Sequence, residues 1–244
     1  MKKSLSILVI AALVICAVFS GCSKEKETIT VGQFFEKYET ASFEKLVKNP
    51  SGFLNDLDQL RDQTFRSNSE LEAISGTEWT GQGDSSEKFF LGEIQLFNQK
   101  ASVEIQIRTS GINKLIQEIP EGYFCIESVS IHFYMYDDMQ QAFPFYKALY
   151  NSSQKQCGNA NEIMIQGKDA TPKELSTLLK DYRPSDDQDG LKLSAKFIKD
   201  TQKVRHENGK YAQTYASTRE LRYNFIPGNY AKITIMDKGT AYKE

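Results

Sequence analysis

Strict alternation of apolar and polar residues constrains the fold of this chain more than any other feature. From Phe89 onwards the repeat is two residues, which matches the alternation of side chains between the two faces of a β-strand. The clearest run lies within 123–136. Its apolar members are Val129, Ile131, Phe133 and Met135, and its polar members are Ser128, Ser130, His132 and Tyr134. A sheet with one face on a core and the other in water is therefore predicted.

Turn residues separate the other alternating runs. One predicted hairpin joins 89–96 to 103–107 across Asn98-Gln99-Lys100. Later runs are expected at 163–165, 191–197, 211–215, 221–225 and 230–236, with turns at Asn208-Gly209 and Pro227-Gly228-Asn229. Because tight turns join strands that run in opposite directions, the predicted sheet is mostly antiparallel.

Helical periodicity precedes the alternating region. Residues 30–76 are predicted to be helical, with apolar positions such as Phe53, Leu57 and Leu60 at spacings of three and four. Further helices are expected at 112–119, 139–150 and 171–182, and the last opens with a capping box and a first-turn proline, Thr171-Pro172-Lys173-Glu174. The predicted fold class is therefore α+β: N-terminal helices packed on a mostly antiparallel β-sheet with two or three further helices.

The N-terminus has the layout of an export signal. Lys2 and Lys3 precede an apolar run over 5–19, and the run ends in Phe19-Ser20-Gly21-Cys22. This end resembles the lipobox of bacterial lipoprotein precursors, although that family prefers Leu at the position of Phe19. The resemblance implies a thioether-linked diacylglycerol on Cys22, cleavage before this cysteine and acylation of the new amine.

An uncleaved anchor helix is the competing interpretation of the same segment, because 4–23 carry no charge and a spanning helix needs roughly 17–25 residues. Both interpretations attach the body to a membrane. The expected organisation is a lipoprotein signal peptide (1–21), a lipidated tether (22–29) and an α+β periplasmic domain (30–244), with a helical portion at 30–76 and a mixed sheet portion at 88–244. By the lipoprotein resemblance, Ser23 after the cysteine implies an outer-membrane location facing the periplasm.

The body retains two cysteines, Cys125 and Cys157. An exported compartment is oxidising, so an even pair favours one disulfide bridge, which would close a loop of roughly 33 residues. A buried thiol, a metal pair and a catalytic cysteine are the alternatives. The sequence has no CxxC or HxxxH spacing, and we therefore predict no metal site.

The charge balance argues against nucleic acid as a partner. The full chain has a net charge of −2, and loss of Lys2 and Lys3 with the signal peptide leaves about −4. One stretch is locally basic and comprises Lys192, Lys196, Lys199, Lys203, Arg205 and Lys210. We interpret this stretch as the solvated face of an outer strand, with lipid headgroups, an acidic polymer or an acidic protein as alternative contacts.

His132 is the best single candidate for chemistry. It shares a predicted strand face with Ser128, Ser130 and Tyr134, and this set is the candidate binding surface. No G-x-S-x-G or HExxH motif occurs, and the GxG at Gly81 and Gly83 lacks a third glycine at the right distance. No catalytic residue and no cofactor are therefore predicted.

For function, we expect a lipid-anchored envelope protein with a non-enzymatic binding or interaction role. Its expected partners are the membrane, through the N-terminal lipid, and a protein or envelope polymer. A periplasmic immunity protein against a secreted toxin is one alternative, supported only by size and location. An envelope hydrolase with the His132 face as its site is the other, and a cleft that holds His132 beside a buried carboxylate would favour it.

Overall fold

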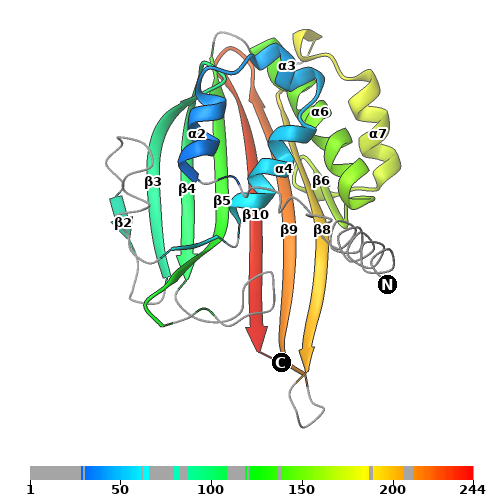
Figure 1. Ribbon diagram of the computed structural model, residues 1–244. Helices are drawn as coiled ribbons and strands as arrows, with labels where there is room; N and C mark the ends of the chain where they lie inside the picture. The colour runs from blue at the N-terminus through cyan, green and yellow to red at the C-terminus, as the bar shows by residue number, and fades with distance from the viewer. Residues whose placement is uncertain are drawn as a thin grey trace, which may run out of the picture.

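The computed structural model describes residues 29, 31–61, 63–65, 80–82, 87–108, 119, 121–136, 139–186, 189–205 and 211–243. Its helices are α2 (Val31–Glu39), α3 (Phe43–Lys48), α4 (Ser51–Leu60), α6 (Met139–Cys157), α7 (Pro172–Asp181) and the short 3-10 helix η1 (Pro184–Asp186). Its strands are β1 (Thr64–Phe65), β2 (Thr80–Gln82), β3 (Glu87–Leu96), β4 (Gln99–Arg108), β5 (Phe124–Met135), β6 (Glu162–Ile165), β7 (Lys168–Asp169), β8 (Leu191–Arg205), β9 (Tyr211–Ile226) and β10 (Tyr230–Lys243). Figure 1 shows α2, α3, α4 and α6 across one face of a large sheet, with α7 beside α6.

The strands form a single sheet of ten strands in which every recorded pairing is antiparallel. The order is β2-β3-β4-β5-β10-β9-β8-β6-β7, and β1 pairs with β5 off this path. The pairing of β5 with β10 joins the two halves of the chain into one layer. The predicted α+β class, with helices packed on a mostly antiparallel sheet, is confirmed.

The face of the sheet that contacts the helices, the inner face, is apolar because alternation and register act together. One row of residues crosses six neighbouring strands in register: Val103, Ile131, Ile235, Leu221, Ala195 and Ile163. Every member of this row is buried. Helix α6 contacts β8, β9 and β10, and α4 contacts β5. The predicted core-facing set on β5, from Val129 to Met135, is likewise confirmed.

The β3–β4 hairpin turns at Phe97 and Asn98, one residue earlier than expected. Both residues have positive φ, 56° and 55°, which matches the two-residue turns that fit the twist of antiparallel strands. The Phe97 N–H donates to the Tyr38 carbonyl at 2.7 Å, and the Asn98 N–H donates to the Glu39 carbonyl at 3.1 Å. The turn therefore satisfies carbonyls at the end of α2 and fixes this helix on the sheet.

Two segments predicted as separate strands, 211–215 and 221–225, form one continuous strand, β9. Arg219 interrupts the apolar pattern between them, but it pairs directly with Asp237 of β10, so the ladder continues. A short strand also interrupts the portion of the chain that was predicted to be helical. Helix α4 ends at Leu60, and Thr64–Phe65 form β1 against β5.

The two later helices begin as their sequences predict. Helix α6 starts at Met139 and continues past the predicted end at residue 150 to Cys157, without ending or restarting at Pro144. Pro144 cannot donate to the carbonyl of Gln140, and both residues are exposed, so water can reach this acceptor. At the start of α7 the expected capping box between Thr171 and Glu174 is present.

Several expectations lie outside the described residues. These are the signal peptide with Cys22, the helical stretch over 66–76, the helix at 112–118 and the Asn208-Gly209 turn. Across the part of the chain that the structure describes, no helix has the length and apolar character needed to cross a membrane.

Candidate functional site

The four residues of the candidate binding surface lie together on the outer face of β5, opposite the core, but two of them are buried. Ser128 lies between Gln106 and Lys238 of the neighbouring strands, and Ser130 occupies the next outward position. Both hydroxyls are short, so longer side chains on the adjacent strands can cover them. His132 and Tyr134 are half-buried and remain partly open to solvent.

His132 does not have the surroundings of a catalytic base. Its Nδ1 lies 2.9 Å from the Thr234 hydroxyl on β10. Burial, followed by the charges of Lys232 and Arg222, lowers the pKa of His132 to about 4. The Glu220 carboxylate lies on β9, two strands away, and is bound by Arg222 at 2.6 Å. His132 is therefore a neutral imidazole at pH 7 that is held by a hydroxyl, whereas a catalytic triad orients its histidine with a carboxylate.

The expected bridge between Cys125 and Cys157 is not formed, and both residues are free thiols. Cys125 pairs with Arg108, and its neighbour Ile126 pairs with the inner-face residue Ile107. Because successive strand side chains point to opposite faces, Cys125 belongs to the outer side, whereas Cys157 ends α6 on the inner side. Burial raises the pKa of the Cys157 thiol, which disfavours the reactive thiolate.

A buried ionic network that was not predicted from the sequence lies between the sheet and the helices. At its centre, Arg219 of β9 forms a bidentate pair with Asp237 of β10, with Nε–Oδ1 and Nη2–Oδ2 distances of 2.8 Å. Arg219 also donates to the Leu54 carbonyl of α4 at 2.9 Å and to Gln156 Oε1 of α6 at 2.7 Å. One side chain therefore ties two helices to the sheet.

Lys199 extends this network to β8, which corrects its interpretation as part of a solvated strand face. A β-bulge between Ile198 and Asp200 accompanies the inward position of Lys199. Its Nζ lies 2.6 Å from Asp58 Oδ1 of α4 and 2.9 Å from Asp237 Oδ2. Such charges are retained in a buried site only when they are paired. In the same stretch, Lys196 does lie on the outer face, paired with Glu162 of β6.

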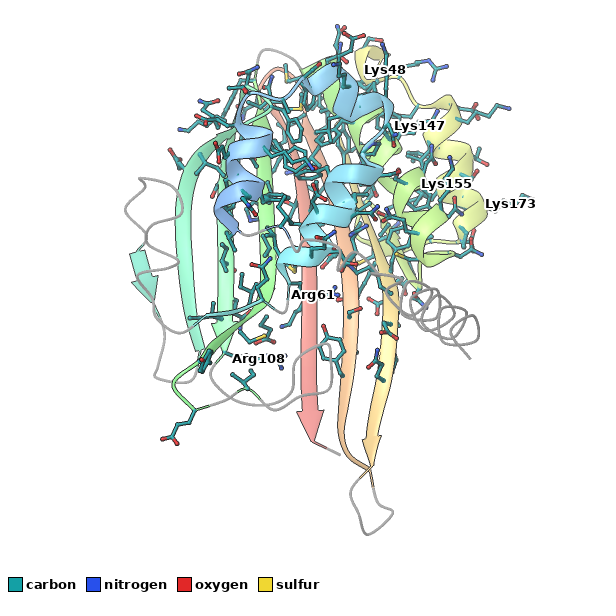
Figure 2. The ribbon with its side chains drawn as sticks, viewed as in Figure 1. Lys48, Arg61, Arg108, Lys147, Lys155 and Lys173 are labelled. Atoms are coloured by element: carbon teal, nitrogen blue, oxygen red, sulfur yellow. The ribbon has the colours of Figure 1, made fainter. Side chains whose placement is uncertain are left out.

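The cations of the network determine the charge state of Asp237. Burial by itself raises the pKa of this carboxyl, but Arg219 and Lys199 outweigh burial and hold the pKa well below its usual range. Arg61, which follows the end of α4 (Figure 2), pairs with Asp58 at 2.8 Å and completes the described ion pairs. The network clamps α4 and α6 onto the sheet.

A sequence signal for this network does exist. Arg219 lies two residues before Leu221 on β9, so it shares a strand face with the buried residues Leu221 and Tyr223. Asp237 likewise shares a face with Ile235 on β10. A charged residue in phase with a buried apolar set must find a partner or destabilise the fold. Opposite charges in phase on two consecutive strands therefore indicate a buried pair.

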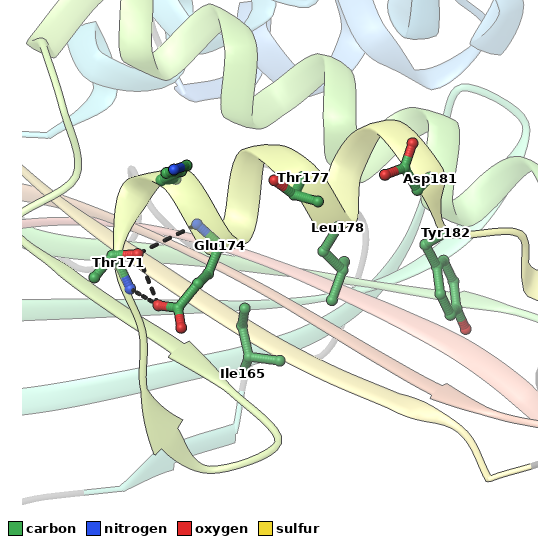
Figure 3. Close-up of a pocket in the computed structure, with 8 residues that line it drawn as sticks. Ile165, Thr171, Glu174, Thr177, Leu178, Asp181 and Tyr182 are labelled. Carbon is green, nitrogen blue, oxygen red and sulfur yellow. Dashed lines mark hydrogen bonds between the residues drawn. The ribbon is translucent and has the colours of Figure 1, made fainter.

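A groove of about 820 Å³ runs along one side of α7, next to β6 near the edge of the sheet (Figure 3). It is lined by Ile165, Thr171, Lys173, Glu174, Thr177, Leu178, Asp181 and Tyr182. Figure 3 shows Leu178 and Tyr182 pointing from the helix toward the side on which Ile165 of β6 lies. These three side chains are partly buried against the core, and they give the groove an apolar floor.

Opposite charges mark the two ends of this groove. Lys173 lies in the first turn of α7 and Asp181 is its last residue, roughly 12 Å apart along the helix axis. Glu174 is committed to the cap, where its Oε2 accepts from the Thr171 N–H at 2.6 Å and the Thr171 hydroxyl at 2.7 Å. These bonds, the backbone bond first, lower the pKa of Glu174. The groove therefore presents Lys173 and the cap-bound Glu174 carboxylate at one end and the Asp181 carboxylate at the other.

The lining of the groove combines apolar side chains with carboxylate, ammonium and hydroxyl groups. Its lining contains no histidine and no cysteine, and the described residues contain no cluster of side chains that could hold a metal ion. The sequence predicted α7 but not the groove, because Ile165 reaches Leu178 only through the packing of α7 on β6. The available signal was Leu178, which extends the apolar stripe of Leu175 and Leu179.

Comparisons with protein-family models, with curated proteins and with solved structures give no match to this chain. The geometry and chemistry of the site are therefore the basis for a functional assignment.

Proposed function

We propose that this chain is a lipid-anchored, non-enzymatic binding protein of the bacterial envelope, and that the groove beside α7 takes a segment of a protein partner. The observation that carries this proposal is the apolar floor of the groove, which has charged side chains at both ends. Attachment through a lipid on Cys22, with the body facing the periplasm from the outer membrane, follows from the lipobox resemblance. The anchor keeps the groove near envelope partners.

The dimensions of the groove fit an extended peptide. From Thr171 to Tyr182 the groove follows the helix for roughly 16 Å, which is about the length of five extended residues. Alternate apolar side chains of such a segment would reach Ile165 and Leu178. An acidic residue at one end would meet Lys173 and a basic residue at the other would meet Asp181, so the partner segment has a defined direction.

The position of the groove at the sheet edge also favours a peptide. Strand β7 pairs with β6 through only Met164–Asp169 and Ile165–Lys168, and it is the last strand in the sheet order. Extended segments commonly bind where an exposed strand edge lies next to apolar side-chain pockets.

The outer face of β5 gives less support to the hydrolase alternative than the groove beside α7 gives to peptide binding. His132 is held by Thr234 and not by a carboxylate. No structural observation favours the immunity-protein alternative over any other protein partner.

Affinity capture from native membranes, with the lipid intact, tests the proposal. Thr177 lies exposed on the rim of the groove, so Thr177→Arg should block the groove without disturbing the core. We expect this variant to keep the wild-type denaturation midpoint and to lose a partner that the wild type retains.

Gln141→Arg is the matched control, because Gln141 is exposed on α6 and does not line the groove. This variant adds the same charge and should retain the partner. Equal capture by Thr177→Arg and by the wild type would refute the groove as the binding site.

A further inference from the structure

Within the part of the chain that the structure describes, the lysines of α6 and α7 have no recorded ion pair. Helix α6 contains no Asp or Glu in its 19 residues, and both acids of α7, Glu174 and Asp181, line the groove side of that helix. By contrast, Lys37, Lys48, Lys100 and Lys196 each form an ion pair elsewhere. A chain with a net charge of −2 therefore has a locally positive surface over α6 and α7. Figure 2 shows Lys147, Lys155 and Lys173 along this side.

A cleft of about 210 Å³ lies between α6 and α7, on the opposite side of α7 from the groove in Figure 3. It is lined by Lys147, Tyr150, Asn151, Gln154, Pro172, Ser176, Leu179 and Lys180. One lysine comes from each helix, and no carboxylate is among the lining residues. Within the described part of the chain, neither Lys147 nor Lys180 has a recorded ion pair or side-chain hydrogen bond.

The polar side chains that line the cleft include several hydrogen-bond donors, which suit an anionic ligand. Asn151 and Ser176 are exposed and add amide and hydroxyl donors from the two helices. The Gln154 amide is oriented by its bond to Asn159 Oδ1 at 3.0 Å. Two ammonium groups carry two positive charges, which a single carboxylate does not balance, whereas a phosphate group offers three or four oxygens and up to two negative charges.

We propose that the cleft between α6 and α7 binds a phosphate group, with Lys147 and Lys180 as the charged contacts. The phosphate belongs either to a free phosphorylated small molecule or to an anionic lipid headgroup of the membrane that carries the protein. This site is separate from the peptide groove, so each of the two proposals can be refuted without affecting the other.

Calorimetric titration of the full lipidated protein in nonionic detergent tests the site. The probes are inorganic phosphate and nanodiscs of phosphatidylglycerol, with phosphatidylcholine nanodiscs as the reference. The test variant is Lys147→Gln with Lys180→Gln. The control is Lys168→Gln with Lys192→Gln, which removes the same charge from exposed lysines on β7 and β8. Both variants should keep the wild-type urea midpoint, because surface lysines of this kind contribute little to stability.

Saturable binding that weakens by about tenfold or more in the test variant and by less than about twofold in the control supports the proposal. Binding of inorganic phosphate identifies a free phosphate ligand, and binding of phosphatidylglycerol nanodiscs alone identifies a headgroup. Equal weakening in both variants would show that only net charge matters. That result, or an absence of saturable binding with both probes, would overturn the proposal.

Discussion

Asp237 is the side chain on which the buried network depends. Its two oxygens accept from Arg219 and Lys199, so Asp237→Asn leaves three buried cations, Arg61, Lys199 and Arg219, with the Asp58 carboxylate alone. Removing one partner of a buried pair typically costs about 3–5 kcal/mol. We expect a loss of this size in the free energy of unfolding, measured by urea denaturation. Glu93→Gln, which breaks the exposed pair with Lys100, should cost less than about 1 kcal/mol.

The Asp237 carboxyl also makes the stability of the protein depend on pH. Because the pKa of Asp237 is lowered in the folded state, its stabilisation is present above the unfolded pKa of about 3.9 and is lost as the pH falls further. Urea midpoints measured from neutral pH to below pH 4 should fall steeply for the wild type. The fall should be shallower for Asp237→Asn. If the urea midpoints of the wild type and of Asp237→Asn fell in parallel with pH, the lowered pKa assigned to Asp237 would be contradicted.

His132 and Ile131 are adjacent residues with opposite environments. Ile131→Ala removes a buried side chain from the inner face and should cost about 2–5 kcal/mol, whereas His132→Ala removes one bond to Thr234 and should cost about 1 kcal/mol or less. Denaturant midpoints of the two variants measure the difference. A larger loss for His132→Ala would contradict the register.

The lowered pKa of His132 adds a pH test. The pKa of His132 is about 6.5 in the unfolded chain and about 4 in the folded protein. Protonation therefore favours the unfolded state, and the wild type should lose stability as the pH falls between these values. His132→Gln lacks this contribution, so its stability should change less over the same range.

Strand β10 passes so close to the end of α4 that position 239 requires a glycine. A Cβ on Gly239 would overlap the Tyr215 hydroxyl and lie 3.1 Å from Arg61 Cδ. Gly239→Ala should therefore destabilise the protein by about 1–3 kcal/mol, the usual cost of overpacking. Gly52→Ala in α4 is the control, because no atom lies within 4 Å of the added Cβ. It should be neutral or slightly stabilising in thermal melts.

Sequence patterns predicted the elements better than their long-range contacts. The faces of β5 and the cap of α7 depend on residues close together in the chain, so local periodicity revealed them. The contact of Lys199 with Asp58 depends on a bulge and on packing of residues far apart in sequence. The positions of Cys125 and Cys157 on opposite sides of the sheet also depend on strand register, which a count of cysteines does not contain.

For the whole molecule, the lipid anchor remains a prediction from the sequence. Cys22→Ala should leave an unprocessed precursor that incorporates no labelled palmitate, because the thioether has no sulfur on which to form. Metabolic labelling followed by electrophoresis measures both effects. Cys16→Ala is the control, since this cysteine lies within the predicted signal peptide. Normal processing of Cys22→Ala would refute the lipoprotein assignment.

The central claim is that a membrane-anchored body binds a protein through the groove beside α7. Site-specific photocrosslinking in native membranes tests it most directly. The photoreactive residue is placed at Thr177 on the groove rim or at Lys192, which is exposed on the opposite face of the sheet and does not line the groove. We predict a discrete crosslinked protein from position 177 and none from position 192. Crosslinks of equal yield from both positions, or none from position 177, would contradict the account.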